Sequence, residues 1–181
     1  MTTFDRVMEF ILRWEGDYVH DPRDPGGDTK YGISKRANPD VDIKNLTVEQ
    51  AKGIYRKRYW DRIGGDRHDY PTALALMDFA VHSGVDTALE FWGADEGLMD
   101  AWSLQQARRK YLTSLSTFPT YGRGWMRRLN ALDDELAKSV VSADVELVQV
   151  YYKDNLLEFK PTKVSVGPSR SGRRKIMVRL D

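Results

Sequence analysis

The amino-acid sequence predicts a mainly helical fold with a small β element near the N-terminal end and a β-rich segment at the C-terminal end. Residues 4–14 place apolar side chains at the i, i+3, i+4, i+7 spacing of a helix with one buried face. Residues 72–82 are apolar on nearly all sides, which is typical of a buried central helix. Residues 15–34 instead combine four glycines with two Asp-Pro steps, a composition that favours tight turns.

The acidic, turn-rich stretch follows directly on the first predicted helix. Glu15 comes four residues after Ile11, so it projects from the same apolar face. A carboxyl against an apolar wall at a helix C-terminus holds its proton more readily than one in water, which suits a general acid. Asp24, between two prolines, is expected to stay ionised, and the Thr29 hydroxyl could position a water molecule. A protonated carboxyl paired with a charged one is the arrangement that hydrolyses a glycosidic bond.

A structural explanation of the same residues is also open. Glu15 can be a solvated acid at a helix end, and the Asp-Pro steps can serve only as turns. For a single Glu that explanation would be the stronger one. Five acids, a histidine and four glycines within twenty residues favour a chemical role for the stretch.

The composition sets outer limits on function. With 41% hydrophobic and 30% charged residues, the chain is an ordinary globular protein, and its net charge of +1 predicts no general attraction to nucleic acid. It has no cysteines, so its stability needs no disulfides. The N-terminal helix contains charged residues, which would break the apolar region of a signal peptide. No apolar run approaches the ~18 residues of a membrane span. We therefore expect synthesis in the cytoplasm and no membrane insertion, and the oligomeric state stays open.

The next predicted helix begins at a capping box. After a loop over residues 35–45, Thr47 and Gln50 have the spacing of a capping box. In that motif each side chain accepts a hydrogen bond from the backbone N–H of the other residue. The helix is expected to end near Tyr59 and Trp60. Both rings could stack on sugars, and both could equally be core residues at a helix end.

The central helix carries one polar pair. Pro71 fits its first position, and Asp78 and His82 lie four residues apart on one face. The pair could reach a binding site, although such pairs more often serve the structure. A short helix over residues 86–92 follows. The sequence holds no spaced cluster of His or Asp ligands, so we expect neither a metal nor a cofactor.

Two further helices complete the helical part. Ser103 is expected to cap a helix that ends near Leu115 and contains a basic run at residues 108–110. The last helix carries an apolar stripe and two arginines, Arg127 and Arg128, which could attract an anionic polymer or simply form a solvated face. The stripe consists of Trp125, Leu129, Leu132 and Leu136.

The C-terminal segment has a different pattern. Residues 163–166 and 175–180 alternate charged and apolar side chains with the period of a strand. Between Lys160 and Arg179 there are seven Lys or Arg residues and no acid. Residues 141–181 are therefore predicted to be a basic β-hairpin or a loosely ordered appendage. It could bind an anionic wall polymer, or pack against the last helix or a second copy of the chain.

The acidic stretch resembles the signature of family 108 glycoside hydrolases, the phage and prophage lysozyme-like muramidases. That signature reads roughly E-G-G-Y, a short acidic stretch, D-P-G-G-x-T and G-I. Asp17 stands where a second Gly is usual, and His20 stands where Asn is common. Residues 78–84 and 118–128 also look like later strings of the family. The matching residues are Glu15, Gly16, Tyr18, Asp21, Pro22, Asp24, Pro25, Gly26, Gly27, Thr29, Gly32 and Ile33.

The resemblance implies a lysozyme-like domain over residues 1–140 that cleaves the β-1,4 bond between N-acetylmuramic acid and N-acetylglucosamine in bacterial peptidoglycan. Its catalytic lobe would span residues 1–65, and residues 66–140 would form a helical peptidoglycan-binding lobe. Glu15 would be the general acid, and Asp24 with Thr29 would stabilise positive charge or orient the attacking water. The expected substrate-binding residues are Tyr18, His20, Tyr31, Tyr59, Trp60, Asp78 and His82.

The resemblance also implies a biological setting. The expected role is that of a phage or prophage endolysin, a bacteriolytic enzyme that a holin delivers to the cell wall in the periplasm. The alternative is a catalytically weak peptidoglycan-binding or secretion-associated protein with the same fold, and the departures at Asp17 and His20 give that alternative its weight.

Overall fold

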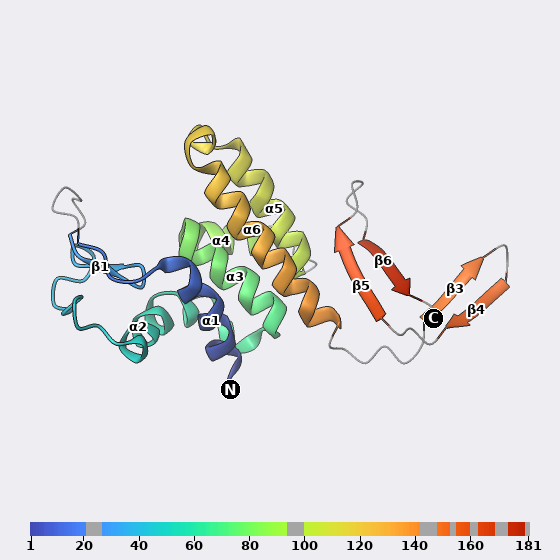
Figure 1. Ribbon diagram of the computed structural model, residues 1–181, viewed down its shortest axis with the longest axis horizontal. Helices are drawn as coiled ribbons and strands as arrows, with labels where there is room; N and C mark the ends of the chain where they lie inside the picture. The colour runs from blue at the N-terminus through green and yellow to red at the C-terminus, as the bar shows by residue number, and fades with distance from the viewer. Residues whose placement is uncertain are drawn as a thin grey trace. The chain divides into compact units, whose positions relative to one another are not determined.

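The computed structural model describes residues 1–20, 27–93, 100–141 and the strand residues of the C-terminal segment; from residue 140 onward only the backbone is described. The chain divides into two compact units, Met1–Arg123 and Gly124–Asp181 (Figure 1). The prediction of a mainly helical fold is confirmed. The helical elements are α1 (Thr3–Glu15), α2 (Val48–Tyr55), η1 (Arg56–Trp60), η2 (Gly65–Arg67), α3 (Tyr70–Ser83), α4 (Val85–Gly93), α5 (Ala101–Ser114) and α6 (Phe118–Val141).

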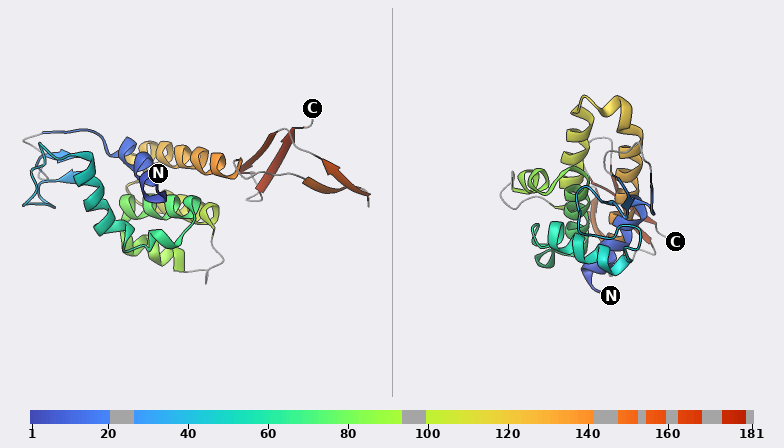
Figure 2. Two further views of the ribbon diagram at one scale, coloured as in Figure 1. Left: turned by 90° about the horizontal axis from the view of Figure 1, so that it is seen from below. Right: turned by 90° about the vertical axis from the view of Figure 1, so that its left-hand side faces the viewer.

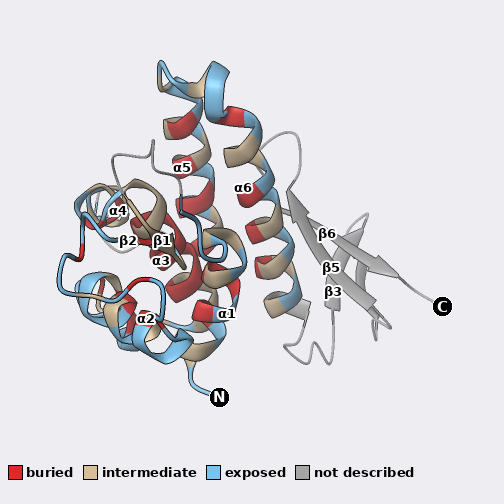
Figure 3. Cartoon of the chain, turned by 60° about the vertical axis from the view of Figure 1, so that its left-hand side comes forward, coloured by how far each residue is buried: buried red, intermediate tan, exposed pale blue. Residues whose placement is uncertain are grey.

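Helix α3 is the centre of the first unit. It packs against α1, α4 and α5, and every residue from Ala73 to Ala80 is buried (Figure 3). Its apolar sequence forms a helix buried on all sides, as predicted. Asp69 caps its first turn by accepting a hydrogen bond from the Thr72 N–H at 3.0 Å.

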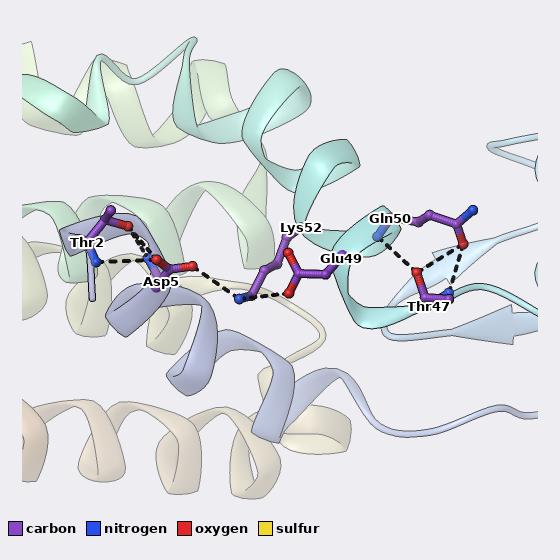
Figure 4. A network of polar contacts seen from close by, with 6 residues as sticks. All are labelled: Thr2, Asp5, Thr47, Glu49, Gln50 and Lys52. Atoms are coloured by element: carbon purple, nitrogen blue, oxygen red, sulfur yellow. Dashed lines mark hydrogen bonds and ion pairs between the residues drawn. The ribbon is translucent and has the colours of Figure 1, made fainter.

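Two capping boxes begin α1 and α2. The box of Thr47 and Gln50 is confirmed, and Thr2 and Asp5 form a second one that the sequence analysis missed (Figure 4). Lys52 then joins the two helices, because its Nζ lies 3.1 Å from a carboxylate oxygen of Asp5. The start of α1 is therefore fixed to α2.

The expected cap of α5 is corrected by the structure. Asp100, not Ser103, is the N-cap residue, and its carboxylate accepts a hydrogen bond from the Ser103 N–H at 2.8 Å. The helix therefore begins at Ala101. An Asp is as good an N-cap as a Ser, so the sequence allowed either position.

A small β-hairpin lies beyond the C-terminal end of α1 (Figures 1 and 2). Strands β1 (Thr29–Lys30) and β2 (Ile33–Ser34) pair antiparallel, which leaves Tyr31 and Gly32 as a two-residue loop. Tyr31 has φ 51° and Gly32 has φ 72°, and positive φ at both central positions is the mark of a type I′ turn. The predicted small β element is this hairpin.

The second unit contains the rest of α6 and two strand pairs. Strand β3 (Val148–Tyr152) pairs antiparallel with β4 (Asn155–Phe159), and β5 (Lys163–Pro168) pairs antiparallel with β6 (Arg174–Arg179). Residues 163–166, which alternate charged and apolar side chains, lie in β5, and residues 175–179 of the second such segment lie in β6.

The apolar stripe of α6 is confirmed at three positions, since Leu129, Leu132 and Leu136 are all buried. Arg128 is buried as well, so the expectation of a solvated face holds only for Arg127. Within the described ranges, none of the helices combines the length and the hydropathy that crossing a lipid bilayer requires.

Candidate active site

Glu15 is the last residue of α1. The helix buries one face and stops at Gly16, whose φ of 75° departs from helical geometry. The Glu15 side chain is half-buried. The sequence therefore places a carboxyl where a buried helix opens into the turn-rich motif.

The turn of the β1–β2 hairpin packs directly on this carboxyl. A Cβ atom on Gly32 would lie 2.6 Å from Glu15 Oε2 and 2.7 Å from Tyr55 Oη. A Cβ in that space would force the Glu15 carboxyl and the Tyr55 hydroxyl to shift, and the φ of 72° adds strain for any residue with a Cβ. Glycine at this position is what allows the hairpin backbone to approach the Glu15 carboxyl.

Tyr55 holds the turn in place from α2. Its ring is buried, and its hydroxyl donates a hydrogen bond to the Tyr31 carbonyl at 2.9 Å. The Tyr31 N–H in turn donates to the Gly16 carbonyl at 3.1 Å. The carboxyl of Glu15 is therefore surrounded by the end of α1, the hairpin turn and one side chain of α2. The sequence analysis missed Tyr55 as a site residue, and its only signal was its place on the buried face of a predicted helix.

Thr29 lies on the same hairpin. It pairs with Val19 through two backbone hydrogen bonds of 2.8 and 3.0 Å, and its hydroxyl donates to the Gly27 carbonyl at 3.4 Å. The structure thus brings Thr29, Tyr31 and Glu15 into one local arrangement. Asp24, the expected second carboxyl, lies outside the described residues, and its role stays a prediction.

Asp28 joins two of the expected substrate-binding residues. The Tyr18 hydroxyl donates to Asp28 Oδ2 at 3.1 Å, and His20 Nδ1 lies 2.5 Å from Asp28 Oδ1. The hydrogen bond with His20 is the largest of the influences that lower the pKa of Asp28, and it outweighs the opposing effect of desolvation. Desolvation and the Asp28 carboxylate raise the pKa of Tyr18. Tyr18 and His20 therefore hold Asp28, which the sequence analysis did not single out although it directly precedes Thr29.

The aromatic pair Tyr59 and Trp60 ends η1, and its two members have different surroundings. Trp60 is fully buried, packs edge-on against Phe4 with ring centroids 5.1 Å apart, and donates from its indole N–H to Asp66. A ring with no exposed face cannot stack on a sugar, so the structure corrects that interpretation of Trp60. Tyr59 is half-buried, stacks on Tyr55 and lines a pocket, so it stays a candidate.

The two polar residues of α3, Asp78 and His82, also have different surroundings. Asp78 is fully buried and accepts a hydrogen bond from Arg108 at 2.6 Å, and Arg108 is itself buried. Asp78 is therefore a structural residue, not one that meets a substrate. His82 is half-buried, with its Nδ1 3.0 Å from the Ser83 hydroxyl, and it stays a candidate.

Among the residues that the structure describes, no three His, Asp or Glu side chains are grouped closely enough to hold a metal ion between them. A half-buried carboxyl, held by a rigid turn and a tyrosine, is suited to donating a proton to a bound substrate.

Comparisons with known proteins give a matching family and a similar solved structure. A family model described as Glycosyl hydrolase 108 matches residues 8–84, which run from within α1 to the end of α3. Among solved structures, the chain is similar to that described as the structure of Brucella abortus SagA. The two share 30% sequence identity with a TM-score of 0.59, and the match covers 74% of this chain and 93% of the other. No curated protein matches the sequence.

Proposed function

Since the chain belongs to glycosyl hydrolase family 108, we propose that it hydrolyses peptidoglycan at the β-1,4 bond between N-acetylmuramic acid and N-acetylglucosamine. Glu15 is the general acid that protonates the leaving oxygen. The observation that carries the proposal is the placement of the Glu15 carboxyl against the Gly32 backbone. General acid catalysis needs a carboxyl held in one position relative to the bond that breaks.

The second half of the mechanism rests on Asp24 and Thr29. Asp24 stabilises positive charge on the sugar or orients the attacking water, and Thr29 assists by binding that water. The role of Thr29 is supported by its place on the hairpin that contacts Glu15. The role of Asp24 is supported by its position in the family motif.

In this proposal the protein is a phage or prophage endolysin. It is made in the host cytoplasm, reaches the periplasm through a holin and degrades the wall there. The support for this setting is the similarity of the motif to phage and prophage members of the family.

A second candidate is a peptidoglycan-binding protein with little or no turnover. The observation in its favour is that His20, which replaces the Asn common in the family, is engaged with Asp28 directly before the hairpin. A binding protein has no need of a proton donor at position 15. The two candidates therefore differ in what they require of Glu15.

Substitution of that residue tests the proposal. Glu15→Gln keeps the size of the side chain but cannot supply the carboxylic proton, so lysis of outer-membrane-permeabilised cells should fall ~100- to 10,000-fold. Glu9→Gln, an exposed acid on the same helix, is the matched control and should keep full activity. Lysis by Glu15→Gln at the wild-type rate would end the assignment, and an inactive wild-type protein would favour the binding candidate.

A further inference from the structure

A pocket of about 840 Å³ is lined mainly by η1, the residues on either side of it, and the start of α4. Its size is within the range of pockets that bind small ligands. Three cationic residues, Lys57, Arg58 and Arg62, line it, and the acid among its described lining residues is Asp86. The pocket therefore has an excess of positive charge, although the whole chain is nearly neutral.

The cations of the pocket differ in how far they are neutralised. Arg62 Nη2 lies 2.9 Å from a carboxylate oxygen of Asp86, so these two charges offset each other. Arg58 donates to the carbonyl of Ala37 at 3.0 Å, a contact that leaves its charge uncompensated. Within the described part of the chain, Lys57 has no hydrogen bond or ion pair. Lys57 and Arg58 thus give the pocket its net charge.

The pocket adjoins the candidate active site. Tyr59, which lines the pocket, stacks on Tyr55 with ring centroids 5.5 Å apart and planes 29° from parallel. The hydroxyl of Tyr55 reaches the Gly32 backbone beside the Glu15 carboxyl. The stacked rings of Tyr59 and Tyr55 therefore connect the lining of the pocket to the residues beside the proposed acid.

We propose that this pocket binds free carboxylates of the peptide stems that peptidoglycan carries on its muramic acid residues. The inference rests on the proposed function, because it takes the glycan at Glu15 to be peptidoglycan. Stem peptides carry several free carboxylates, whereas the sugars to which they are attached offer mainly hydroxyl and amide groups. Lys and Arg recognise carboxylates through charge-assisted hydrogen bonds. The pocket would make the protein prefer glycan strands that still bear peptides.

The test compares two substrates that share one glycan. Soluble peptidoglycan strands with stem peptides are measured beside the same strands after an amidase has removed the peptides. The variants are Lys57→Gln/Arg58→Gln and Lys57→Gln alone, which breaks no contact with a described residue. The matched control is Lys110→Gln/Arg123→Gln, which removes two exposed positive charges away from the pocket.

The pocket proposal predicts a change confined to the peptide-bearing strands. Their kcat/KM should fall about tenfold in the double variant and about threefold in Lys57→Gln, mainly through KM. The loss should shrink at high salt, since exposed charges are then screened. The peptide-free strands and the control should show the wild-type values. Equal losses on both substrates, or an equal loss in the control, would overturn the proposal.

Binding measurements separate this proposal from the proposed function. Affinities of both strands for Glu15→Gln protein can be measured whether or not the wild type cleaves either. Equal affinity for the peptide-bearing and the peptide-free strands would overturn the pocket proposal. Competition by inorganic phosphate as strong as that by free stem peptide would overturn it as well. A wild-type protein that cleaves neither strand overturns the proposed function instead.

Discussion

Gly32 and Glu15 are in contact across the motif, with Glu15 Oε2 2.6 Å from the point where a Gly32 Cβ would stand. The two residues belong to different elements, since Glu15 ends α1 and Gly32 lies in the turn of the β1–β2 hairpin. Their contact makes the position of the proposed acid depend on the shape of the turn.

Gly32→Ala should therefore impair catalysis more than folding. The new methyl group collides with Glu15 Oε2 and Tyr55 Oη, and the positive φ costs ~1 kcal/mol in addition. Displacement of a catalytic group by about 1 Å can cost ~100-fold in rate, so we expect a loss of that order in kcat. Gly53→Ala is the control, because nothing lies within 4 Å of its Cβ and it sits in α2, where alanine should add ~0.5–1 kcal/mol of stability. Full activity in Gly32→Ala would show that the carboxyl is not fixed by the turn.

Tyr55→Phe should loosen the same turn without a collision. The substitution removes the hydroxyl and leaves the Tyr31 carbonyl without that donor, at a cost of ~1 kcal/mol in the free energy of unfolding. We expect kcat to fall several-fold, because the turn that positions Glu15 is less constrained. Tyr111→Phe, which removes a hydroxyl from a half-buried ring of α5, serves as the control for activity. An unchanged kcat in Tyr55→Phe would assign Tyr55 to stability alone.

Acid should destabilise the protein through Asp5. Hydrogen bonds from Thr2, followed by that from Lys52, lower the pKa of Asp5 from 3.8 to about 2. The folded state thus favours the charged carboxylate. Its contribution to stability is complete above the ordinary pKa and is lost as the pH falls from about 4 towards 2. Urea unfolding of the wild type and of Asp5→Asn should therefore converge over this range, and a constant difference at all pH values would contradict the prediction.

The buried pair of Asp78 and Arg108 should be costly to break. Both side chains are removed from solvent, so Asp78→Asn takes the negative charge of this pair away from a buried guanidinium, at ~3–5 kcal/mol. The double variant Asp78→Leu/Arg108→Met, which removes both charges of the pair, should lose less than Asp78→Asn does. Chemical denaturation measures both. A double variant that is the less stable of the two would show that contacts other than the charge pair dominate at this place.

Features that depend on a few neighbouring residues could be predicted from the sequence. The capping box of Thr47 and Gln50 spans four residues, and the apolar stripe of α6 spans a few turns of one helix. The helical fold and the small β element near Glu15 follow from such local patterns. The same local reasoning left the cap of α5 ambiguous, because both Asp100 and Ser103 have side chains that cap helices.

Features that depend on partners distant in the sequence could not be predicted from it. Arg108 stands in a basic run, yet successive helical residues point about 100° apart, so one arginine can be buried while Lys110 is exposed. Its partner, Asp78, is 30 residues away. Trp60 is buried because Phe4 packs on it, and no local pattern shows that contact.

The candidate site follows the same division. Its acid was evident from the motif, whereas the residues that hold the acid were not. Tyr55 reaches the Tyr31 carbonyl across 24 positions of the chain, and the contact of Gly32 with Glu15 depends on how the hairpin folds back. The motif therefore predicted the family, whereas only the fold shows which residues lie beside Glu15.

The packing of α1 on α3 sets an order of events during synthesis. The hairpin turn and Tyr55, which lie beside Glu15, belong to the first 55 residues, but the apolar face of α1 is covered by a helix that ends only at Ser83. Until that helix has left the ribosome, Phe4 and its apolar neighbours have no central helix to cover them, and a chaperone is the natural partner for such a surface. The apolar face of α1 therefore stays without its central partner until the first 83 of the 181 residues have been made.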